Sequence, residues 1–307
     1  MSSSIKHIRV VSDGRPGHEN QSAGLAAAIS RRTRATIETA RFEKGSWLWA
    51  RCRKAASKTQ SVPDLLIGAG HKVHLPLWFA ARAFRAKSVV IMKPTWPVGL
   101  FDLCLIPRHD LDSEESSERI ILTLGALNRI PEEIPPKQRR GVILIGGPSK
   151  NHGWAAAPLI EAVTTVIRSR QDLAWTVGDS RRTPEGFLSQ LAASGLPAEC
   201  VPMSKTTPDW LPAQLLSAEE VWVTEDSVSM VFEAITAGNR VGLLPVPTSH
   251  DGNDVSRALQ QLVLENYATT YSAWLKTGRQ LPPPKRLHET ARCAELVLER
   301  LFANRRQ

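Results

Sequence analysis

The chain has 307 residues, 42% of them hydrophobic, and carries 39 Lys and Arg against 30 Asp and Glu. No run of apolar residues approaches the roughly 18 that a membrane-spanning helix requires, which excludes an integral membrane protein, and the four dispersed cysteines exclude a disulfide framework. The net charge of +9 favours partners that bear phosphate, namely nucleotide sugars, nucleic acids or anionic lipids.

The polar start of the chain leads directly into a strand pattern rather than into a signal peptide, so we expect a cytoplasmic protein. Short apolar runs then alternate with helical patterns. Strand, helix, strand order implies a parallel sheet, and a first Rossmann-like domain is predicted for residues 1–130. Helices are expected at 20–30 and 73–84, and strands at 8–12, 36–40, 64–67, 88–92, 103–107 and 120–124.

Residues 126–141 hold three prolines and a charged cluster, which suit neither a helix nor a strand, and we place an interdomain linker at 131–141. The alternation then resumes. Residues 142–307 are therefore predicted as a second domain, whose final helix at 289–302 packs back on the first. The sequence predicts an α/β protein with two doubly wound, Rossmann-like domains that face each other across a cleft. The second domain is expected to have strands at 142–145, 173–177, 221–224 and 241–244, and helices at 154–168, 184–193 and 227–237.

The helix expected at 227–237 carries a polar stripe. With 3.6 residues per turn, Asp226, Ser229 and Glu233 share one face, while apolar residues face the sheet. The free N–H groups and positive dipole at its start, together with Ser227, suit a diphosphate, and Glu233 is placed to accept both hydroxyls of a ribose. A second interpretation has Asp226 or Ser227 capping the helix and Glu233 in solvent.

Two loops that follow expected strands also suit anions. The run 146–150, Gly-Gly-Pro-Ser-Lys, permits close backbone approach to a phosphate and adds hydroxyl and ammonium donors. The run 180–184, Ser-Arg-Arg-Thr-Pro, offers two guanidinium groups, although an arginine pair on a loop is often a solvated turn. Because parallel sheets gather ligands at the carboxyl ends of their strands, we expect both loops to lie near the helix start. The candidate donor-binding residues in these loops are Gly147, Ser149, Lys150, Ser180, Arg181 and Arg182.

In the first domain, a glycine-bearing polar turn at 13–21 opens the first helix, and another at 68–72 follows a strand. A histidine in such a turn exchanges a proton near neutral pH, as deprotonation of a sugar hydroxyl requires. We therefore assign His18 and Asp13 as candidate catalytic residues; the alternative is a histidine that is hydrogen-bonded only for structure. No HExxH pattern or Cys/His ligand cluster occurs, so neither a metal nor a cofactor is expected.

Residues 42–54 and 75–87 interleave aromatic residues with Lys and Arg. This mixture suits the surface of an anionic membrane, where rings anchor among the headgroups and cations contact phosphate. The competing interpretation, which we favour on sequence alone, is core packing with arginines that extend their charge into solvent. Positive charge is interpreted as scattered through the chain and no known module is evident, so nucleic acid is not an expected partner.

Four motifs in this chain resemble the bacterial branch of the mitochondrial-fission ELM-type family. They are SDGRPGHENQ at 12–21, IGGPSK at 145–150, SRRTP at 180–184 and EDSVSM at 225–230, and they follow the order found in the family. Bacterial members look like GT-B glycosyltransferases, so the resemblance implies a GT-B-like fold.

The segment 229–238 is similar to the nucleotide-binding helix of the peptidoglycan N-acetylglucosaminyltransferase, which implies that Glu233 binds a ribose. The Gly-His pair at 17–18 is similar to the end of that enzyme's glycine-rich first turn. Its fuller glycine run is absent here, because Arg15 and Pro16 replace it.

Taken together, residues and resemblance predict a metal-independent, inverting glycosyltransferase that moves a sugar from a nucleotide-diphosphate donor to an acceptor. A lipid-linked or polysaccharide acceptor is expected, which would place the protein peripherally on the inner face of the inner membrane. The rival prediction, from the fission role of plant relatives, is a non-catalytic adaptor that recruits a membrane or a protein through its basic, aromatic surface.

Overall fold

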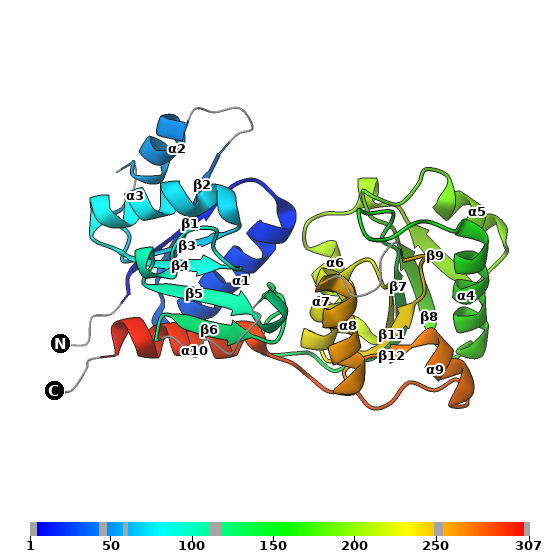
Figure 1. Ribbon diagram of the computed structural model, residues 1–307. Helices are drawn as coiled ribbons and strands as arrows, with labels where there is room; N and C mark the ends of the chain where they lie inside the picture. The colour runs from blue at the N-terminus through cyan, green and yellow to red at the C-terminus, as the bar shows by residue number, and fades with distance from the viewer. Residues whose placement is uncertain (1–4, 43–47, 58–60, 111–117, 249–253, 304–307) are drawn as a thin grey trace. The chain divides into compact units, whose positions relative to one another are not determined.

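The computed structural model describes residues 5–42, 48–57, 61–110, 118–248 and 254–303 (Figure 1). The chain forms two compact units. Unit 1 comprises Met1–Arg129 together with His288–Gln307, and unit 2 comprises Ile130–Leu287. The last segment of the chain therefore belongs to the unit that the first segment builds.

Unit 1 contains a sheet of six parallel strands in the order β2-β1-β3-β4-β5-β6. Its central strands are short apolar runs with nearly all residues buried, as a parallel sheet covered on both faces requires. Val10 of β1 lies opposite Thr39 of β2 and Ile67 of β3. The strands are β1 (His7–Ser12), β2 (Thr36–Arg41), β3 (Leu65–Ala69), β4 (Lys87–Ile91), β5 (Leu103–Pro107) and β6 (Ile120–Thr123).

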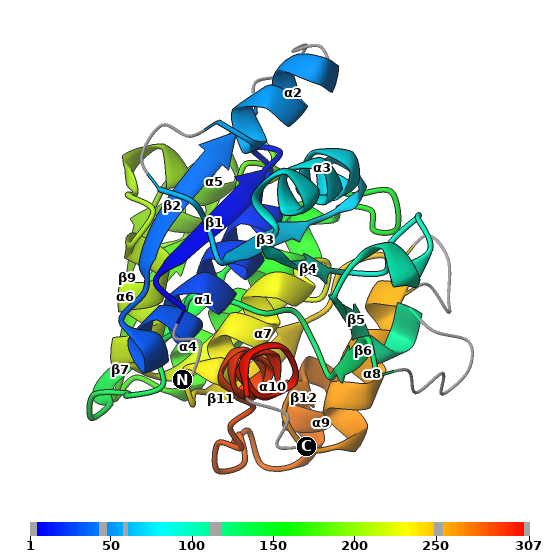
Figure 2. The ribbon, with the colours of Figure 1, turned by 90° about the vertical axis from the view of Figure 1, so that its left-hand side faces the viewer.

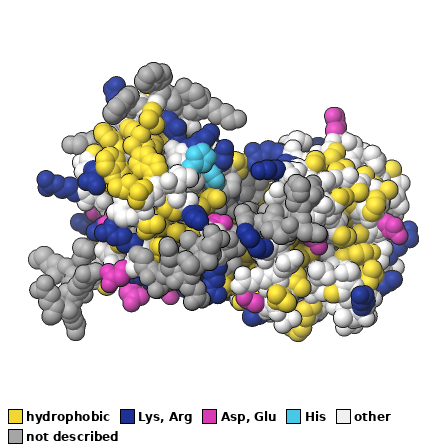
Figure 3. Space-filling view, in the orientation of Figure 1, with side chains coloured by type: hydrophobic (Ala, Val, Ile, Leu, Met, Phe, Trp, Pro, Cys, Tyr) yellow, Lys and Arg dark blue, Asp and Glu magenta, His cyan; other side chains and the backbone are white. Residues whose placement is uncertain are grey.

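Helices cover both faces of this sheet. α1 (Pro16–Thr33) and α10 (Glu289–Phe302) pack together on one face, where Val297 is fully enclosed. α3 (His74–Phe84) covers the opposite face, and α2 (Leu48–Ala55) packs on α3 (Figure 2). In the space-filling view, apolar side chains are exposed on this side of unit 1 (Figure 3). Three short 3-10 helices lie in loops: η1 (His71–Val73), η2 (Val98–Leu100) and η3 (Arg108–Asp110).

Unit 2 contains a second sheet of six parallel strands, in the order β12-β11-β10-β7-β8-β9. Val221 of β10 lies opposite Val142 of β7 and Val241 of β11, and all three are buried. The strands are β7 (Gln138–Leu144), β8 (Ala174–Gly178), β9 (Ala198–Val201), β10 (Ala218–Thr224), β11 (Arg240–Leu244) and β12 (Thr269–Thr270).

The helices of unit 2 also divide between two faces. One face carries α4, α5 and α9, whose buried side chains join Trp175 and Trp222 of the sheet. The other face carries α6, α7 and α8, which contact one another in sequence (Figure 1). The helices are α4 (Ala156–Ser169), α5 (Phe187–Ala193), α6 (Trp210–Ser217), α7 (Val228–Thr236), α8 (Asp254–Leu264) and α9 (Tyr271–Lys276), with the 3-10 helix η4 (Met203–Lys205).

The prediction of an α/β protein with two Rossmann-like domains is confirmed by these two sheets. The predicted linker differs from the structure, because β7 begins at Gln138, inside the range 131–141. The first residues of β7 are polar and exposed, and Arg139 pairs with Asp172 beside β8, so this strand end lacks the apolar pattern of its buried half.

In each sheet, the crossovers change direction at one pair of neighbouring strands. Successive strands extend outward from β1 toward β2 and from β3 toward β6 in unit 1, and from β7 toward β9 and from β10 toward β12 in unit 2. Ligands of doubly wound proteins bind beyond the carboxyl ends of strands at such switch points. The loops after β1 and β3, and those after β7 and β10, are therefore where a site is expected.

Candidate functional site

In unit 2, the glycine pair after β7 touches the loop after β10. The Gly146 N–H donates to Thr224 Oγ1 at 2.8 Å, and the Gly147 N–H donates to Asp226 Oδ2 at 3.0 Å. A Cβ on Gly146 would lie 2.1 Å from Asp226 Oδ2, and one on Gly147 would lie 2.0 Å from the Arg182 carbonyl oxygen. The glycines are therefore required for the loops after β7, β8 and β10 to meet.

Arg182 joins these three loops. Its Nη2 donates to Asp226 Oδ2 at 2.6 Å and to Ser227 Oγ at 3.0 Å, and its Nη1 donates to the Gly147 carbonyl at 2.8 Å. The Asp226 carboxylate is fully enclosed, whereas the Arg182 side chain is 41% exposed. Arg182 thus neutralises a buried carboxylate and keeps one side of its guanidinium toward solvent.

The start of α7 has no side-chain cap. Ser227 is the N-cap residue, but its hydroxyl donates to Asp226 Oδ2 at 2.8 Å. Within the described residues, no side chain accepts a hydrogen bond from the free N–H groups at this helix start. The interpretation in which Asp226 or Ser227 caps the helix is therefore wrong. Glu233 is only 7% exposed, so its placement in solvent is wrong as well. The first turn of α7, including the exposed Ser229, leaves its positive dipole end without a side-chain acceptor.

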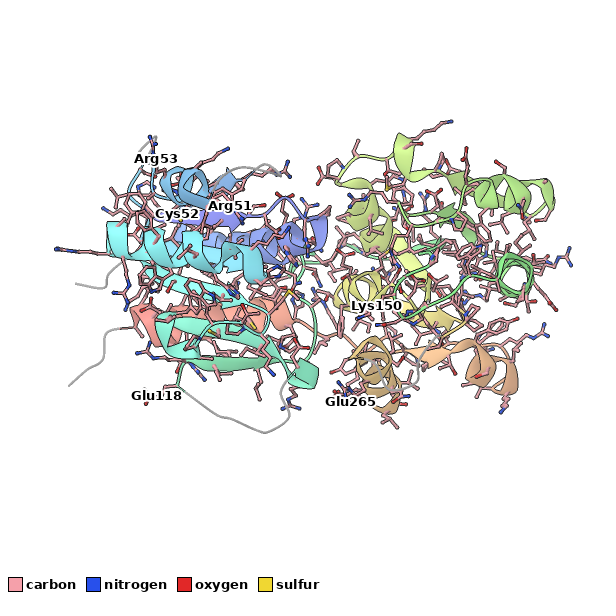
Figure 4. All side chains as sticks on the ribbon, turned by 45° about the horizontal axis from the view of Figure 1, so that its top comes forward. Arg51, Cys52, Arg53, Glu118, Lys150 and Glu265 are labelled. Atoms are coloured by element: carbon pink, nitrogen blue, oxygen red, sulfur yellow. The ribbon has the colours of Figure 1, made fainter. Side chains whose placement is uncertain are left out.

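The remaining predicted residues of unit 2 lie on the same loops. Ser149 Oγ is 3.3 Å from His152 Nδ1, and Ser180 Oγ is 3.2 Å from Thr183 Oγ1, which in turn donates to the Gly146 carbonyl at 2.5 Å. Arg181 is exposed, as is Lys150, which Figure 4 labels. The structure thus joins one group of predicted residues in a hydrogen-bond network and leaves a second group exposed, on loops or in the first turn of α7. The joined group is Gly147, Arg182, Asp226 and Ser227; the second is Lys150, Arg181 and Ser229.

Two residues beside this network were missed in the sequence. His152 is 3% exposed, and burial lowers its pKa, with Asp226 opposing that shift and Arg182 adding to it. Burial also raises the pKa of Glu225. Burial therefore disfavours the charged form of both groups. Glu225 opens the EDSVSM motif, and His152 is marked only by its nearness in sequence to Lys150.

His152 and Glu225 line a cavity of about 440 Å³ next to the α7 loop. Its apolar lining comes from β11 and α8, and three hydroxyl groups and one amide also line it. A few polar groups in an apolar cavity are typical of a small-molecule site. The other lining residues are Leu243, Thr248, Ser256, Leu259, Gln260, Val263, Leu264 and Thr270.

In unit 1, Asp13 and His18 form a pair at the switch point. His18 Nδ1 lies 3.1 Å from both oxygens of Asp13, whose side chain is 2% exposed, against 16% for His18. The Arg15 N–H also donates to Asp13 Oδ1. With Nδ1–H directed at the carboxylate, Nε2 is left as the proton acceptor of the ring. This is the arrangement of a general base and its orienting carboxylate.

The second polar turn of unit 1 supports that histidine. Gly70, after β3, has φ +80°, and a Cβ there would lie 2.3 Å from His18 Cε1. Only glycine fits this position, because the backbone passes directly against the imidazole ring. The two turns that the sequence marks separately, after β1 and after β3, therefore form one structure around His18.

Glu19, next to His18, forms hydrogen bonds that stabilise the fold around this turn. Its carboxylate accepts from Arg41 Nε at 2.7 Å and from Ser12 Oγ at 2.6 Å, and the Ser12 hydroxyl also accepts from the Gly14 N–H. The Arg41 hydrogen bond lowers the pKa of Glu19. Glu19 thus fastens the first turn of α1 to β1 and β2.

In the described part of the chain, no helix combines the length and apolar character needed to cross a bilayer. Among the same residues, no three His, Cys, Asp or Glu side chains gather closely enough to hold a metal ion.

Two Rossmann-like units in one chain are typical of GT-B proteins, and solved structures of that kind resemble this fold. The UDP-GlcNAc 2-epimerase of Neisseria meningitidis, solved with UDP-GlcNAc bound, matches with a TM-score of 0.55 and 12% identity over 97% of this chain and 100% of that one. The glycosyltransferase SnogD of Streptomyces nogalater matches with a TM-score of 0.51 and 16% identity over 96% and 99%. At these identities the likeness concerns the fold.

The chain belongs to the mitochondrial fission ELM1 family, whose sequence model matches residues 16–301. The resemblance inferred from the four motifs is thereby confirmed. An uncharacterised protein of Rickettsia prowazekii (strain Madrid E) is 23% identical over 97% of this chain and 99% of its own length.

Proposed function

We propose that the protein is a glycosyltransferase that takes a sugar from a nucleotide-diphosphate donor and transfers it with inversion, without a metal ion. The uncapped start of α7, held by the Arg182 and Asp226 network at the switch point of unit 2, carries this proposal. A helix terminus with free N–H groups is a ready anion site, and the guanidinium beside it adds positive charge. One structural neighbour was solved with UDP-GlcNAc bound and another is a glycosyltransferase, which supports a nucleotide sugar as the donor.

In unit 2, the donor diphosphate would bind at the first turn of α7. Ser227 and Ser229 lie at that turn, and the exposed cations Lys150 and Arg181 lie on the adjoining loops. These groups would offset the negative charge that grows on the departing diphosphate. Glu233, one turn farther along the helix, would accept the ribose hydroxyls, since a carboxylate pairs well with a diol.

In unit 1, the acceptor would lose its proton to His18. Asp13 holds Nδ1–H, so Nε2 takes the proton from an acceptor hydroxyl as its oxygen bonds to the anomeric carbon. The bond from that carbon to the diphosphate breaks on the opposite face, and the nucleoside diphosphate leaves with the electron pair. Attack opposite the leaving group inverts the anomeric centre. We propose a lipid-linked acceptor at the inner membrane face, because the exposed cations and apolar side chains of unit 1 suit an anionic interface.

A non-catalytic adaptor is the second candidate. The family name points to a role in mitochondrial fission, and an adaptor would need only the basic, aromatic surface of unit 1. Such a protein would leave nucleotide sugars unbound.

Native mass spectrometry of the purified protein tests the donor proposal. We expect a co-purifying nucleotide sugar or nucleoside diphosphate in the wild type and its loss in Glu233→Gln, because the amide is a poorer acceptor for two ribose hydroxyls. Glu185→Gln, an exposed carboxylate of the same unit, serves as the matched control and should retain the ligand. If neither wild type nor control holds or binds any nucleotide, the adaptor replaces the transferase. Conversion of a bound nucleotide sugar without an acceptor would contradict transfer.

A further inference from the structure

Positive charge is concentrated in one segment of the sequence. Residues 44–101 contain ten Lys and Arg but a single acidic residue, Asp64, so their net charge of +9 equals that of the whole chain. The remaining residues are neutral in sum. The interpretation of scattered charge is therefore wrong, and the charge belongs to the part of unit 1 that includes α2 and α3.

We name the exposed face of these two helices the α2–α3 surface. It bears aliphatic and aromatic groups beside cations, and Leu48 at the start of α2 is 46% exposed. A groove of about 590 Å³ lies between α2 and α3, and Phe79, two alanines, Arg53 and Lys54 line it. Figure 3 shows an apolar patch on this side of unit 1 with Lys and Arg around it. The residues of the surface are Leu48, Ala50, Arg53, Lys54, Ala56, Phe79, Arg82 and Arg85.

The cations of this surface are available to a ligand. Among the described residues, no carboxylate forms an ion pair with Arg53, Lys54 or Arg85. Arg82 lies over the Trp78 ring, 4.6 Å from its centroid, and is also exposed. In Figure 4, Arg53 points away from the body of the unit. Arg53 and Lys54 both line the groove, and no described carboxylate pairs with them, so they are able to attract phosphate groups.

Core packing explains other arginines of unit 1 but not this surface. Arg9 is 1% exposed and lies over Phe84, and Arg51 lies over Phe42, as the packing interpretation predicts. In the described part of unit 1, the same interpretation gives no packing partner to the exposed Leu48 or to the open groove. A surface that combines unpaired cations with exposed aliphatic groups fits a ligand that is anionic on one side and apolar on the other.

We propose that the α2–α3 surface binds a bilayer of anionic phospholipid. Arg53, Lys54 and Arg85 would contact headgroup phosphates, while the exposed Leu48 and Phe79 in the groove would face the acyl boundary. Lipid is favoured over nucleic acid because an aliphatic side chain such as Leu48 does not stack on a nucleic-acid base. The same side chain gains transfer free energy when it enters the acyl region of a bilayer. This inference deepens the membrane location given in the proposed function and rests on it there, but vesicle binding is measured without any transferase reaction.

Co-sedimentation of the full chain with vesicles tests the proposal. Wild type should bind vesicles of phosphatidylglycerol and phosphatidylcholine, and should bind phosphatidylcholine alone far more weakly. Loss of one cation near an anionic surface lowers partitioning about fivefold, so R53Q with K54Q should lower it on the order of 25-fold. The control K205Q with K276Q removes the same charge from exposed positions of unit 2 and should bind as wild type does.

A second variant tests the apolar part of the surface. Leu48→Ser leaves the charge unchanged and replaces an exposed side chain, so the fold should persist while partitioning falls several-fold. Equal vesicle binding by wild type and R53Q/K54Q, or an equal loss of vesicle binding in the unit 2 control, would overturn the proposal. Binding of the protein to a single-stranded RNA that the vesicles do not displace would overturn it as well. Nucleotide binding in unit 2 should be unchanged in all these variants, so failure here is distinct from failure of the transferase proposal.

Discussion

At the scale of single residues, the site of unit 2 depends on positions where no side chain fits. Gly146 and Gly147 bring the β7 loop against a buried carboxylate and a backbone carbonyl. A sequence pattern indicates that such glycines allow another group to approach the backbone closely. It does not say whether that group is a phosphate or part of the protein itself. Here the protein makes it, and any ligand meets the outer side of that network.

Gly146→Ala is expected to destabilise the protein by about 1–3 kcal/mol, because its Cβ would lie 2.1 Å from Asp226 Oδ2 and force the loops apart. Urea unfolding measures this change. Gly17→Ala is the matched control, since its Cβ would meet nothing within 4 Å and its φ is not positive. An effect of Gly146→Ala no larger than that of Gly17→Ala would contradict the packing described for this turn.

His152 makes the stability depend on pH. Burial lowers its pKa below the usual 6.5, so just below pH 6.5 the unfolded chain holds a proton that the folded protein does not. The free energy of unfolding should fall as the pH drops through this window. The raised pKa of Glu225 acts in the opposite direction above pH 4.5, so the difference between wild type and His152→Gln isolates the histidine. An identical pH dependence in both proteins would show that His152 is not buried as described.

His18 provides the sharpest catalytic prediction. Once a donor and acceptor are known, His18→Gln should lower the transfer rate by a factor of about 10² to 10⁴, with donor affinity unchanged, because the proton acceptor is lost and unit 2 is untouched. Asp13→Asn should lower the rate less and alter its pH profile, since it acts by orienting the ring. His71→Gln, an exposed histidine of the same unit, should turn over normally. Normal turnover by His18→Gln would assign the base elsewhere.

At the scale of elements, the sequence predicts those with a clear apolar pattern and misses several that lack one. The strand at 103–107 and the helix at 289–302 are found at their predicted bounds, because apolar periodicity defines them. α6 was missed because Pro212 reads as a breaker, although proline is tolerated in a first helical turn. The edge strand β9 was missed because it is only partly buried. Short elements depend on packing that no local pattern records.

The same reasoning applies to the site. The three loops after β7, β8 and β10 could be predicted, since strand ends of a parallel sheet share one edge. Asp226 could not be identified as a buried partner of Arg182, because its spacing fits a helix cap equally well. His152 lies outside every motif, and its burial follows from the bridge to Thr248, which is distant in sequence.

α10 completes the core of a unit whose other elements lie about 160 residues earlier. Cys293, Ala294 and Val297 are fully enclosed against α1 and the sheet, so deletion of 288–307 should unfold unit 1. Hydrogen exchange should then show loss of protection in β1–β6 and retained protection in β7–β11. Retained protection in β1–β6 would contradict the role assigned to this helix.

At the scale of the whole molecule, two similar units carry different chemistry. Unit 1 holds the pair of His18 and Asp13 and the net positive charge of the sequence. Unit 2 holds the uncapped start of α7 and the hydrogen-bond network of Arg182. The topology is alike in both, so the difference lies in the loops at the two switch points. This division is what a two-substrate transfer reaction requires, with one unit for each substrate.

Calorimetric binding of nucleoside diphosphates to the full chain tests this account most directly. Wild type should bind at least one of UDP, GDP, ADP or CDP, and Ser229→Asp should abolish binding, because a carboxylate at the first turn of α7 would repel the diphosphate and occupy the free N–H groups. Ser189→Asp on α5 makes the same charge change at an exposed position and should bind as wild type does. Undiminished affinity in Ser229→Asp would contradict a diphosphate site at α7.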